Sequence, residues 1–186
     1  MVRPGRDRLS GTVEVDETDI GGERPGKRGR GATGKQLVVI VAQKKGHRIG
    51  RIRLRRVPDA SGASLKEAIQ ATVEPGSVVR TDGWQAYGGL SELGYTHQVV
   101  REDGVVGENL LPLAHRVAAL PKRWLMGTYQ GAVGGSHLDY YLDEYTFRFN
   151  RRTSRSRGKL FYRLLQQAAA VDPVPAKHIA GRKSSS

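Results

Sequence analysis

Hydrophobic and polar residues alternate near the start of the chain in a pattern typical of a β-strand. In TVEVDETDI (12–20), Val13 and Val15 fall on one face, and Glu14 and Asp16 fall on the other. Successive side chains of a strand point to opposite faces of its sheet, so the valines are expected to face a core. The same alternation places two carboxylates together on the opposite face.

Two further strands are predicted after a glycine-rich basic loop at 23–35. LVVIVAQ (37–43) is a continuous apolar run, which is typical of a buried strand. After the turn KKGH, the segment RIGRIRLRR alternates again, and we expect Ile52 and Leu54 to face inward and the arginines around them to face outward. Three strands joined by loops predict an antiparallel meander.

The middle of the chain predicts a helix followed by two short strands. Asp59 or Ser61 can cap a helix that continues to Thr72. VVRT (78–81) predicts a short strand that ends at Asp82, and YTHQVV predicts another. Between these strands, GWQAYGGLSELG predicts a short helix that breaks at glycine.

Three helices are predicted in the last part of the chain. LLPLAHRVAALPKRWLMG has a helical pattern that is interrupted by Pro121. SHLDYYLDEYTFRFN (136–150) is amphipathic, and its Ser136 and Asp139 resemble a capping box. GKLFYRLLQQAAAV (158–171) predicts a second amphipathic helix. This order of strands and helices predicts a mixed α/β fold.

Composition agrees with one folded domain. Of the 186 residues, 38% are hydrophobic and 26% are charged, which is ordinary for a globular protein and excludes a wholly disordered chain. No apolar run is long enough to cross a membrane, and the absence of cysteine excludes disulfides and thiolate zinc sites. We expect the domain at 12–171, between a disordered or truncated lead at 1–11 and a disordered basic tail at 172–186.

The charge of the chain indicates a polyanionic partner. Lys and Arg number 31 against 18 Asp and Glu, which gives a net charge of +13 and an isoelectric point near 10.4. Three runs, at 24–35, 44–56 and 148–163, contain basic side chains and no acidic ones. Such runs neutralise nucleic-acid phosphates with little sequence preference, although they can also be solvated faces and loops. Nucleic acid is therefore the favoured partner.

Two aspartates occupy positions suited to a divalent-metal site for phosphodiester cleavage. Asp16 lies in the middle of the first strand, and Asp82 ends a later strand. Two-metal cleavage needs acidic ligands that converge from different elements, and Mg²⁺ prefers oxygen ligands. A residue of the helix at 112–126 would complete the site. Each aspartate also has an ordinary explanation, because Asp16 can be a solvent-facing strand residue and Asp82 can cap the turn that follows it.

Several motifs, in their order along the chain, resemble the catalytic domain of bacterial insertion-sequence transposases, in the ISXO-like branch of the DDE transposases. They are VEVDETDIGGERPGKRGRGATGK, TDGWQAY, and KRWLMGTYQGAV followed by HLDYYLDEYTFRFNRR, and they span about residues 12–168. The resemblance implies a ribonuclease H-like fold. Its five-stranded mixed sheet would begin with three antiparallel strands and carry helices on both faces.

The resemblance also implies a mechanism and a set of site residues. Two Mg²⁺ or Mn²⁺ ions would activate water to cut DNA at an element end, and the freed 3′-hydroxyl would then attack target DNA. Asp16 and Asp82 correspond to the first two acidic ligands of the family. The third acidic position lies seven residues before a lysine that contacts phosphate, which gives His115 and Lys122 in this sequence.

Three residues depart from the family pattern, so the sequence leaves catalytic activity open. His115 replaces an acidic ligand, and imidazole suits softer metals than Mg²⁺. Asp103 and Glu108 in the preceding loop are alternative acidic ligands. Pro121 replaces an apolar residue and is expected to kink the helix between the two site residues. Asp19 stands where the family usually has tyrosine.

Members of this family also carry an N-terminal zinc ribbon and a DNA-reading segment, and neither has a counterpart in this sequence. A truncated copy, an orphan catalytic domain or a mis-assigned gene start would each explain the difference. With no signal-peptide pattern, the expected location is cytoplasmic and associated with the nucleoid.

Three functions therefore remain open. The first is a transposase catalytic domain that acts on double-stranded DNA as a homo-oligomer. The second is a catalytically inactive remnant that only binds DNA, and the third is a general basic nucleic-acid-binding protein. The residues expected to contact DNA are Lys27, Arg28, Arg30, Lys35, Lys122, Arg123, Arg151 and Arg152.

Overall fold

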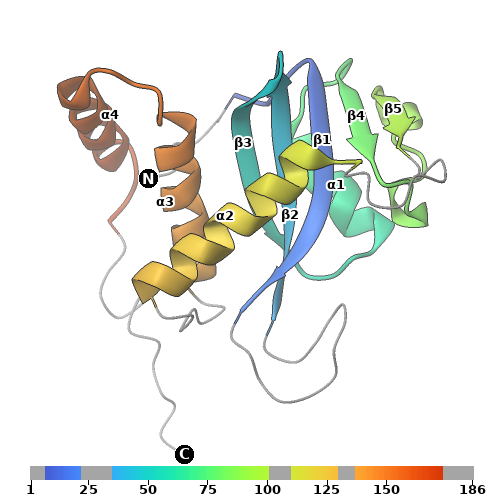
Figure 1. The fold of residues 1–186 in the computed structure, drawn as a ribbon, viewed down its shortest axis with the longest axis horizontal. Coiled ribbons are helices and arrows are strands. Elements are labelled where there is room, and N and C mark those ends of the chain that lie inside the picture. Colours follow the sequence, from blue (N-terminus) through green and yellow to red (C-terminus); the bar gives the residue numbers. More distant parts are fainter. Residues whose placement is uncertain (1–6, 22–34, 101–109, 130–136, 174–186) are drawn as a thin grey trace, which may run out of the picture.

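The structure, a computed structural model, describes residues 7–21, 35–100, 110–129 and 137–173. Within these residues a five-stranded sheet carries helices on both faces (Figure 1). The strands are β1 (Thr12–Ile20), β2 (Gln36–Lys45), β3 (Arg48–Val57), β4 (Val78–Thr81) and β5 (Thr96–Val99). The helices are α1 (Gly62–Thr72), α2 (Pro112–Tyr129), α3 (Leu138–Asn150) and α4 (Arg157–Ala169), with two 3₁₀ turns, η1 (Gln85–Tyr87) and η2 (Ser91–Leu93).

The strand order is β3-β2-β1-β4-β5, so β1 lies at the centre of the sheet. The β1–β2 and β2–β3 pairs are antiparallel, whereas the β1–β4 and β4–β5 pairs are parallel. The predicted antiparallel meander and the mixed five-stranded sheet are therefore confirmed. The parallel pairs arise because α1 carries the chain from the outer strand β3 back across the sheet to β4.

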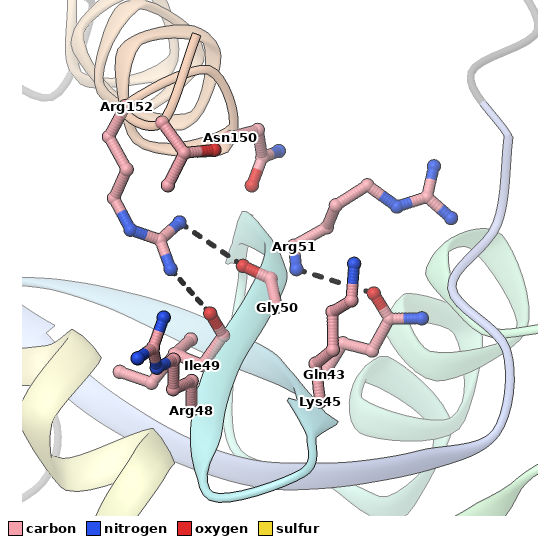
Figure 2. A pocket seen from close by; sticks show the side chains of 9 residues that line it. Gln43, Lys45, Arg48, Ile49, Gly50, Arg51, Asn150 and Arg152 are labelled. Atoms are coloured by element: carbon pink, nitrogen blue, oxygen red, sulfur yellow. Dashed lines mark hydrogen bonds between the residues drawn. The ribbon is translucent and has the colours of Figure 1, made fainter.

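The free edge of β3 is covered by side chains from the end of α3. The Asn150 side chain accepts a hydrogen bond from the Ile52 N–H at 2.7 Å and donates one to the Ile52 carbonyl at 3.1 Å. The Arg152 guanidinium donates to the carbonyls of Gly50, at 3.2 Å, and of Ile49 (Figure 2). Backbone groups on a sheet edge can pair with another chain, so these contacts satisfy the edge and fix α3 against it.

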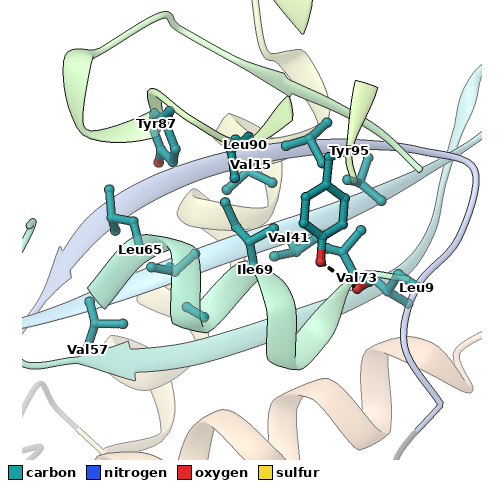
Figure 3. Close-up of a cluster of buried hydrophobic side chains, with 14 residues drawn as sticks. Leu9, Val15, Val41, Val57, Leu65, Ile69, Val73, Tyr87, Leu90 and Tyr95 are labelled. Atoms are coloured by element: carbon teal, nitrogen blue, oxygen red, sulfur yellow. Dashed lines mark hydrogen bonds between the residues drawn. The ribbon is translucent and has the colours of Figure 1, made fainter. Parts of the chain in front are cut away.

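Apolar layers fill both faces of the sheet. Because side chains alternate along each strand, Val13 and Val15 of β1 face α1, and Ile40 of β2 faces α2 and α3. Figure 3 shows the layer beneath α1. Its buried members are Leu9, Val13, Val15, Val39, Val41, Val57, Leu65, Ala68, Ile69, Val73, Val79, Tyr87, Leu90 and Tyr95.

The segment before β1 is more ordered than the sequence predicts. Leu9 is fully buried in the layer beneath α1, although residues 1–11 are expected to be a disordered or truncated lead. Its N–H donates to the Thr72 carbonyl at 2.8 Å, and its carbonyl accepts from the Glu74 N–H at 2.8 Å. The expectation is wrong at this end, since one leucine gains both apolar burial and backbone pairing. Residues 1–6, and residues 174–186 of the predicted tail, lie outside the described part.

Several predicted helix boundaries depend on local capping. At α1 both candidates contribute, because the Ser61 side chain accepts from the Ser64 N–H and Asp59 accepts from the Ser61 N–H. At α3, Ser136 of the predicted capping box lies outside the described residues, and the N-cap residue is His137. The other predicted member, Asp139, accepts hydrogen bonds from Arg56 at 2.7 and 3.2 Å.

Two other expectations need correction. The helix predicted after Asp82 is replaced by the 3₁₀ turns η1 and η2, which glycines terminate. Arg53, expected to face solvent, is only 8% exposed, because its guanidinium donates to the carbonyls of Ile52 and Asp7 at 3.0 and 2.5 Å. The predicted amphipathic helix near the end of the chain is present as α4, but none of its residues is buried.

Helix α2 continues through Pro121, contrary to the predicted interruption. Pro121 is buried and lies on the same face as the buried residues Ala114, Val117 and Leu125. A proline removes one backbone hydrogen bond from a helix, and packing of an apolar face against a core offsets such a cost. None of the described helices is long and apolar enough to span a membrane.

We predict that Asn150→Ala destabilises the protein by about 1–3 kcal/mol, because the buried Ile52 N–H and carbonyl lose their partners. Urea unfolding followed by circular dichroism measures the change. The exposed Gln70→Ala, on α1, is the matched control and should shift stability by less than about 0.5 kcal/mol. Equal shifts in both variants would contradict a role for Asn150 at the sheet edge.

Candidate active site

The centre of β1 presents carboxylates to both of its faces. Glu14 and Asp16 lie on the side that α2 covers, where each contacts residues of α2. Glu17 lies on the side of η1, where it contacts Tyr87. This distribution follows from the alternation of side chains along a strand. The sequence pattern correctly placed Glu14 and Asp16 on one face but assigned no role to Glu14 or Glu17.

Glu14 anchors the beginning of α2 although it is 99 residues away in the sequence. Its Oε2 accepts hydrogen bonds from the N–H groups of Leu113 and Ala114 at 2.8 and 3.1 Å. Its Oε1 lies 3.3 Å from the Arg80 guanidinium of β4, and the side chain is only 1% exposed. The first N–H groups of a helix lack partners within the helix and favour negative charge. Leu111, which precedes α2, has no side-chain acceptor, so Glu14 caps the helix in its place.

Asp16 and His115 are in contact because Glu14 fixes α2. His115 follows Ala114 in the first turn of α2, and Asp16 is two residues beyond Glu14 on the same face of β1. The His115 Nε2 lies 3.3 Å from the Asp16 Oδ2, and the two side chains are 51% and 17% exposed. The other carboxylate oxygen, Oδ1, accepts a hydrogen bond from the Glu17 N–H at 2.9 Å.

Asp82 directly follows β4, the parallel neighbour of β1. The pairing of these strands runs from Thr12 and Val78 to Glu14 and Arg80, and Asp16 and Asp82 each come two residues after that last pair. β4 ends at Thr81, and the exposed Asp82 side chain accepts a hydrogen bond from the Trp84 N–H at 3.0 Å. The ordinary explanation, that Asp82 caps the following turn, is thus correct. It does not exclude a ligand role for the same carboxylate.

The turn after Asp82 requires glycine at position 83. Gly83 has φ of +80°, and a Cβ at this position would collide with the Val99 side chain of β5. A left-handed backbone is strained for residues with a side chain. The glycine therefore allows the chain to leave β4 sharply and holds Asp82 at the end of the sheet.

Tyr87 binds Glu17, the carboxylate on the opposite side of β1. Its hydroxyl donates to the Glu17 Oε2 at 2.5 Å, and its ring is 1% exposed. Burial raises the pKa of Tyr87 well above its usual range, and the negative charges of Glu17, Asp16 and Asp82 raise it further. The hydroxyl is therefore a neutral donor within reach of three carboxylate charges. Apart from the proximity of Tyr87 to Asp82 along the chain, no pattern in the sequence indicates this role.

Lys122 lies seven residues after His115, about two helical turns along α2. Partial burial lowers the pKa of Lys122, and the positive charge of Lys35 lowers it further, whereas Asp19 and Asp16 oppose the shift. Lys35 and Asp19 therefore lie close to this amine. The continuous helix keeps Lys122 and His115 on one side of α2, where the predicted kink would have separated them.

The candidate metal donors are the carboxylates of Asp16 and Asp82 and the imidazole of His115. Within the described residues, no group of three or more His, Asp or Glu side chains is arranged to hold a metal ion. Mg²⁺ is typically bound by one or two carboxylates, with water and substrate phosphate completing its shell. Asp16 and Asp82 fit that requirement, whereas His115 suits a softer metal better. Asp103 and Glu108, the alternative ligands, lie outside the described residues.

The residues expected to contact DNA fall into separate groups. Arg123 is exposed on α2 beside Lys122, and Lys35 is exposed just before β2. Arg151 and Arg152 end α3, and their guanidinium groups lie over the rings of Phe147 and Phe149 at 3.9 and 4.0 Å. These two groups are formed by different elements. Lys27, Arg28 and Arg30 lie outside the described residues.

Comparison with protein families relates this arrangement to transposition enzymes. A family model, the ISXO2-like transposase domain, matches residues 8–150. That range contains β1 to β5, α1, α2 and α3, and it includes Asp16, Asp82 and His115. No curated protein matches the chain.

Two solved structures are similar in fold. The catalytic core domain of BIV integrase has a TM-score of 0.50 and 12% identity, and the match covers 87% of this chain and 97% of the integrase chain. A chain of the simian T-cell lymphotropic virus intasome, in complex with the PP2A regulatory subunit B56 gamma, has a TM-score of 0.50 and 14% identity. That match covers 94% of this chain and 62% of the other. Integrase catalytic cores have the ribonuclease H-like fold, and this chain shares it.

We predict that Glu14→Gln destabilises the protein by about 1.5–3 kcal/mol, because a charged acceptor of two helix N–H groups is lost beside Arg80. Urea unfolding measures the loss. The control is Glu67→Gln, which removes an exposed ion pair with Arg55 and should cost less than about 1 kcal/mol. If both variants lose the same stability, Glu14 does not anchor α2.

The raised pKa of Tyr87 predicts that the protein loses stability at alkaline pH. Since its pKa is raised in the folded state, an unfolded tyrosine releases its proton first, above about pH 10. The contribution of Tyr87 is thus complete below pH 10 and declines above it, by about 1.4 kcal/mol per pH unit. Urea unfolding between pH 9 and 11 should show a shallower decline for Tyr87→Phe than for the exposed control Tyr162→Phe. Parallel declines would refute this assignment.

Proposed function

The chain belongs to the ISXO2-like transposase domain family, and we propose that it cleaves and joins DNA strands at a metal site built on Asp16 and Asp82. The observation that carries this proposal is the contact between Asp16 of β1 and His115 of α2. Asp82, which follows the parallel neighbour strand β4, is proposed as the second carboxylate of the same site.

In the proposed reaction, Asp16 and Asp82 hold one or two divalent cations, Mg²⁺ or Mn²⁺. Such ions supply activation of water and stabilisation of charge on the phosphate. Hydrolysis adds water across one P–O bond of the element end and leaves a free 3′-hydroxyl. That hydroxyl then attacks a phosphodiester of the target, so that one P–O bond forms as another breaks.

His115 and Lys122 have different roles in this scheme: His115 acts at Asp16, and Lys122 acts at a phosphate. A protonated His115 pairs with Asp16, and a neutral one can accept a proton from water or contribute a nitrogen ligand. In this scheme, Lys122 contacts a phosphate oxygen. Because partial burial and Lys35 lower the pKa of Lys122, a phosphate beside it would favour its charged form.

The proposed substrate is double-stranded DNA, bound by a homo-oligomer in the cytoplasm at the nucleoid. The net charge of +13 supports a polyanionic ligand. The intasome that resembles this chain in fold supports a DNA assembly by analogy. A catalytically inactive remnant is the second candidate function, and the observation that favours it is His115 at a position where the family has an acidic ligand.

We predict that the protein nicks duplex DNA carrying element ends in Mg²⁺ or Mn²⁺. Asp16→Asn and Asp82→Asn should each reduce the rate by at least about 100-fold, as expected when a charged group that acts on the transition state is removed. Gel electrophoresis of labelled duplexes measures the products. Glu67→Gln, on the opposite side of the sheet, is the matched control and should retain activity.

The variant His115→Glu separates the two candidate functions. Increased cleavage would mean that the histidine impairs an acidic site, and decreased cleavage would mean that His115 itself takes part. Salt-sensitive DNA binding without cleavage in either metal, by wild type and by His115→Glu, would support the inactive remnant.

A further inference from the structure

Two basic runs that are far apart in the sequence meet at one hollow on the surface. It has a volume of about 450 Å³ and lies between the β2–β3 hairpin and the end of α3 (Figure 2). The hairpin contributes Lys45, Arg48 and Arg51, and the end of α3 is followed by Arg152. The hollow lies on the outer side of the sheet, at β3, whereas Asp16 lies on the central strand β1.

The electrostatic character of this hollow is strongly positive. Its four cationic side chains are accompanied by the amides of Gln43 and Asn150, and none of its lining residues is acidic. One counter-charge lies nearby, Asp7, whose Oδ2 is 3.9 Å from a guanidinium nitrogen of Arg51. Both side chains of that pair are largely exposed, so its attraction is weak and screened by salt.

The Arg152 guanidinium is held in position by the protein itself. It donates to the carbonyls of Gly50, Ile49 and Phe149 and lies over the Phe149 ring. These contacts use three of the five N–H donors that a guanidinium carries. A cation that is already oriented loses little conformational freedom when an anion binds beside it.

Oxygen-rich anions match this combination of groups. Guanidinium groups form paired hydrogen bonds with phosphate, and lysine adds a mobile point charge. Amide N–H₂ groups donate further hydrogen bonds without changing the charge. A hollow of this size, with several cations along one rim, suits a phosphate that is attached to a larger molecule better than a small free ion.

We propose that this hollow is a second DNA contact, which binds backbone phosphates of a strand outside the cleavage site. The proposal rests on DNA being the ligand of the protein, as proposed above, but not on cleavage. It explains why basic residues of the hairpin and of the α3 terminus, separated by about a hundred positions in the sequence, line the same surface. Sequence-independent contacts of this kind hold a duplex in register while base-reading is done elsewhere.

DNA-binding measurements with metal removed by EDTA test this contact without any cleavage. Fluorescence anisotropy of a labelled duplex gives Kd at several salt concentrations for wild type, Arg48→Gln and Lys66→Gln. Loss of one phosphate contact should make the slope of log K against log salt shallower by about 0.9 in Arg48→Gln. Lys66, on α1, is the matched control and should leave the slope unchanged. Identical slopes in all three proteins would overturn the proposal.

A crosslinking experiment locates the contact directly, because the chain contains no cysteine. Arg48→Cys and the control Gln70→Cys each carry a single thiol, to which a photoactivatable group is attached. The hairpin variant should crosslink to duplex DNA at least about tenfold more than the control, as expected for a group beside the backbone. Equal crosslinking would contradict the proposal even if the protein binds DNA.

Inorganic phosphate is the probe that distinguishes a free anion from a DNA strand. If millimolar phosphate raises the melting temperature of wild type but not of Arg48→Gln, while DNA affinity is equal in both, the hollow is a small-anion site and the proposal fails. If DNA affinity alone depends on Arg48, the strand is the ligand. Loss of DNA binding in every protein, wild type included, would instead contradict the proposed function as a whole.

Discussion

One buried carboxylate joins the three elements on which the candidate site depends. Glu14 of β1 accepts two N–H groups of α2 and faces Arg80 of β4, so a single side chain sets the position of a helix and supports the pairing of two strands. A buried charge is costly unless hydrogen bonds and an opposite charge compensate for it. Here both are present, and the compensation is possible only when α2 begins at this point over β1. The geometry of Asp16 and His115 is a consequence, because each lies within two residues of a group that Glu14 fixes.

The carboxylates on the two faces of β1 have different partners. On the α2 side, Asp16 contacts His115, and Asp82 follows the neighbouring strand β4. On the other side, Glu17 accepts a hydrogen bond from Tyr87, whose burial keeps its hydroxyl protonated. Three carboxylates that would repel one another are thus separated by the strand and linked to neutral or positive partners.

The sequence predicted the strands well because strand patterns depend on residues that are neighbours in the chain. Alternation in β1 and β3 and the apolar run of β2 each depend on neighbouring residues, and so does the cap of α1. The cap of α2 could not be predicted in this way, since Glu14 lies 99 residues before its first partner. The continuous helix through Pro121 and the burial of Leu9 were missed for the same reason: their stabilising contacts come from the tertiary core. The partner of Asp139, Arg56, lies 83 residues before it in the sequence, so this pair could not be predicted from neighbouring residues either.

The carboxylates around β1 would repel a nucleic-acid backbone, and basic residues elsewhere on the surface would attract it. Asp16, Glu17 and Asp82 repel a nucleic-acid backbone at the place where a phosphodiester would have to enter. Screening limits the reach of surface charge to about 10 Å at 0.1 M salt, so attraction must come from cations around the centre and not from net charge alone. The Lys122 amine interacts electrostatically with Asp16 and Asp19, and the hollow at the β2–β3 hairpin carries four cations on the outer part of the sheet. Under the proposed function, cations at these two places would hold a duplex across the acidic centre without occupying the carboxylates themselves.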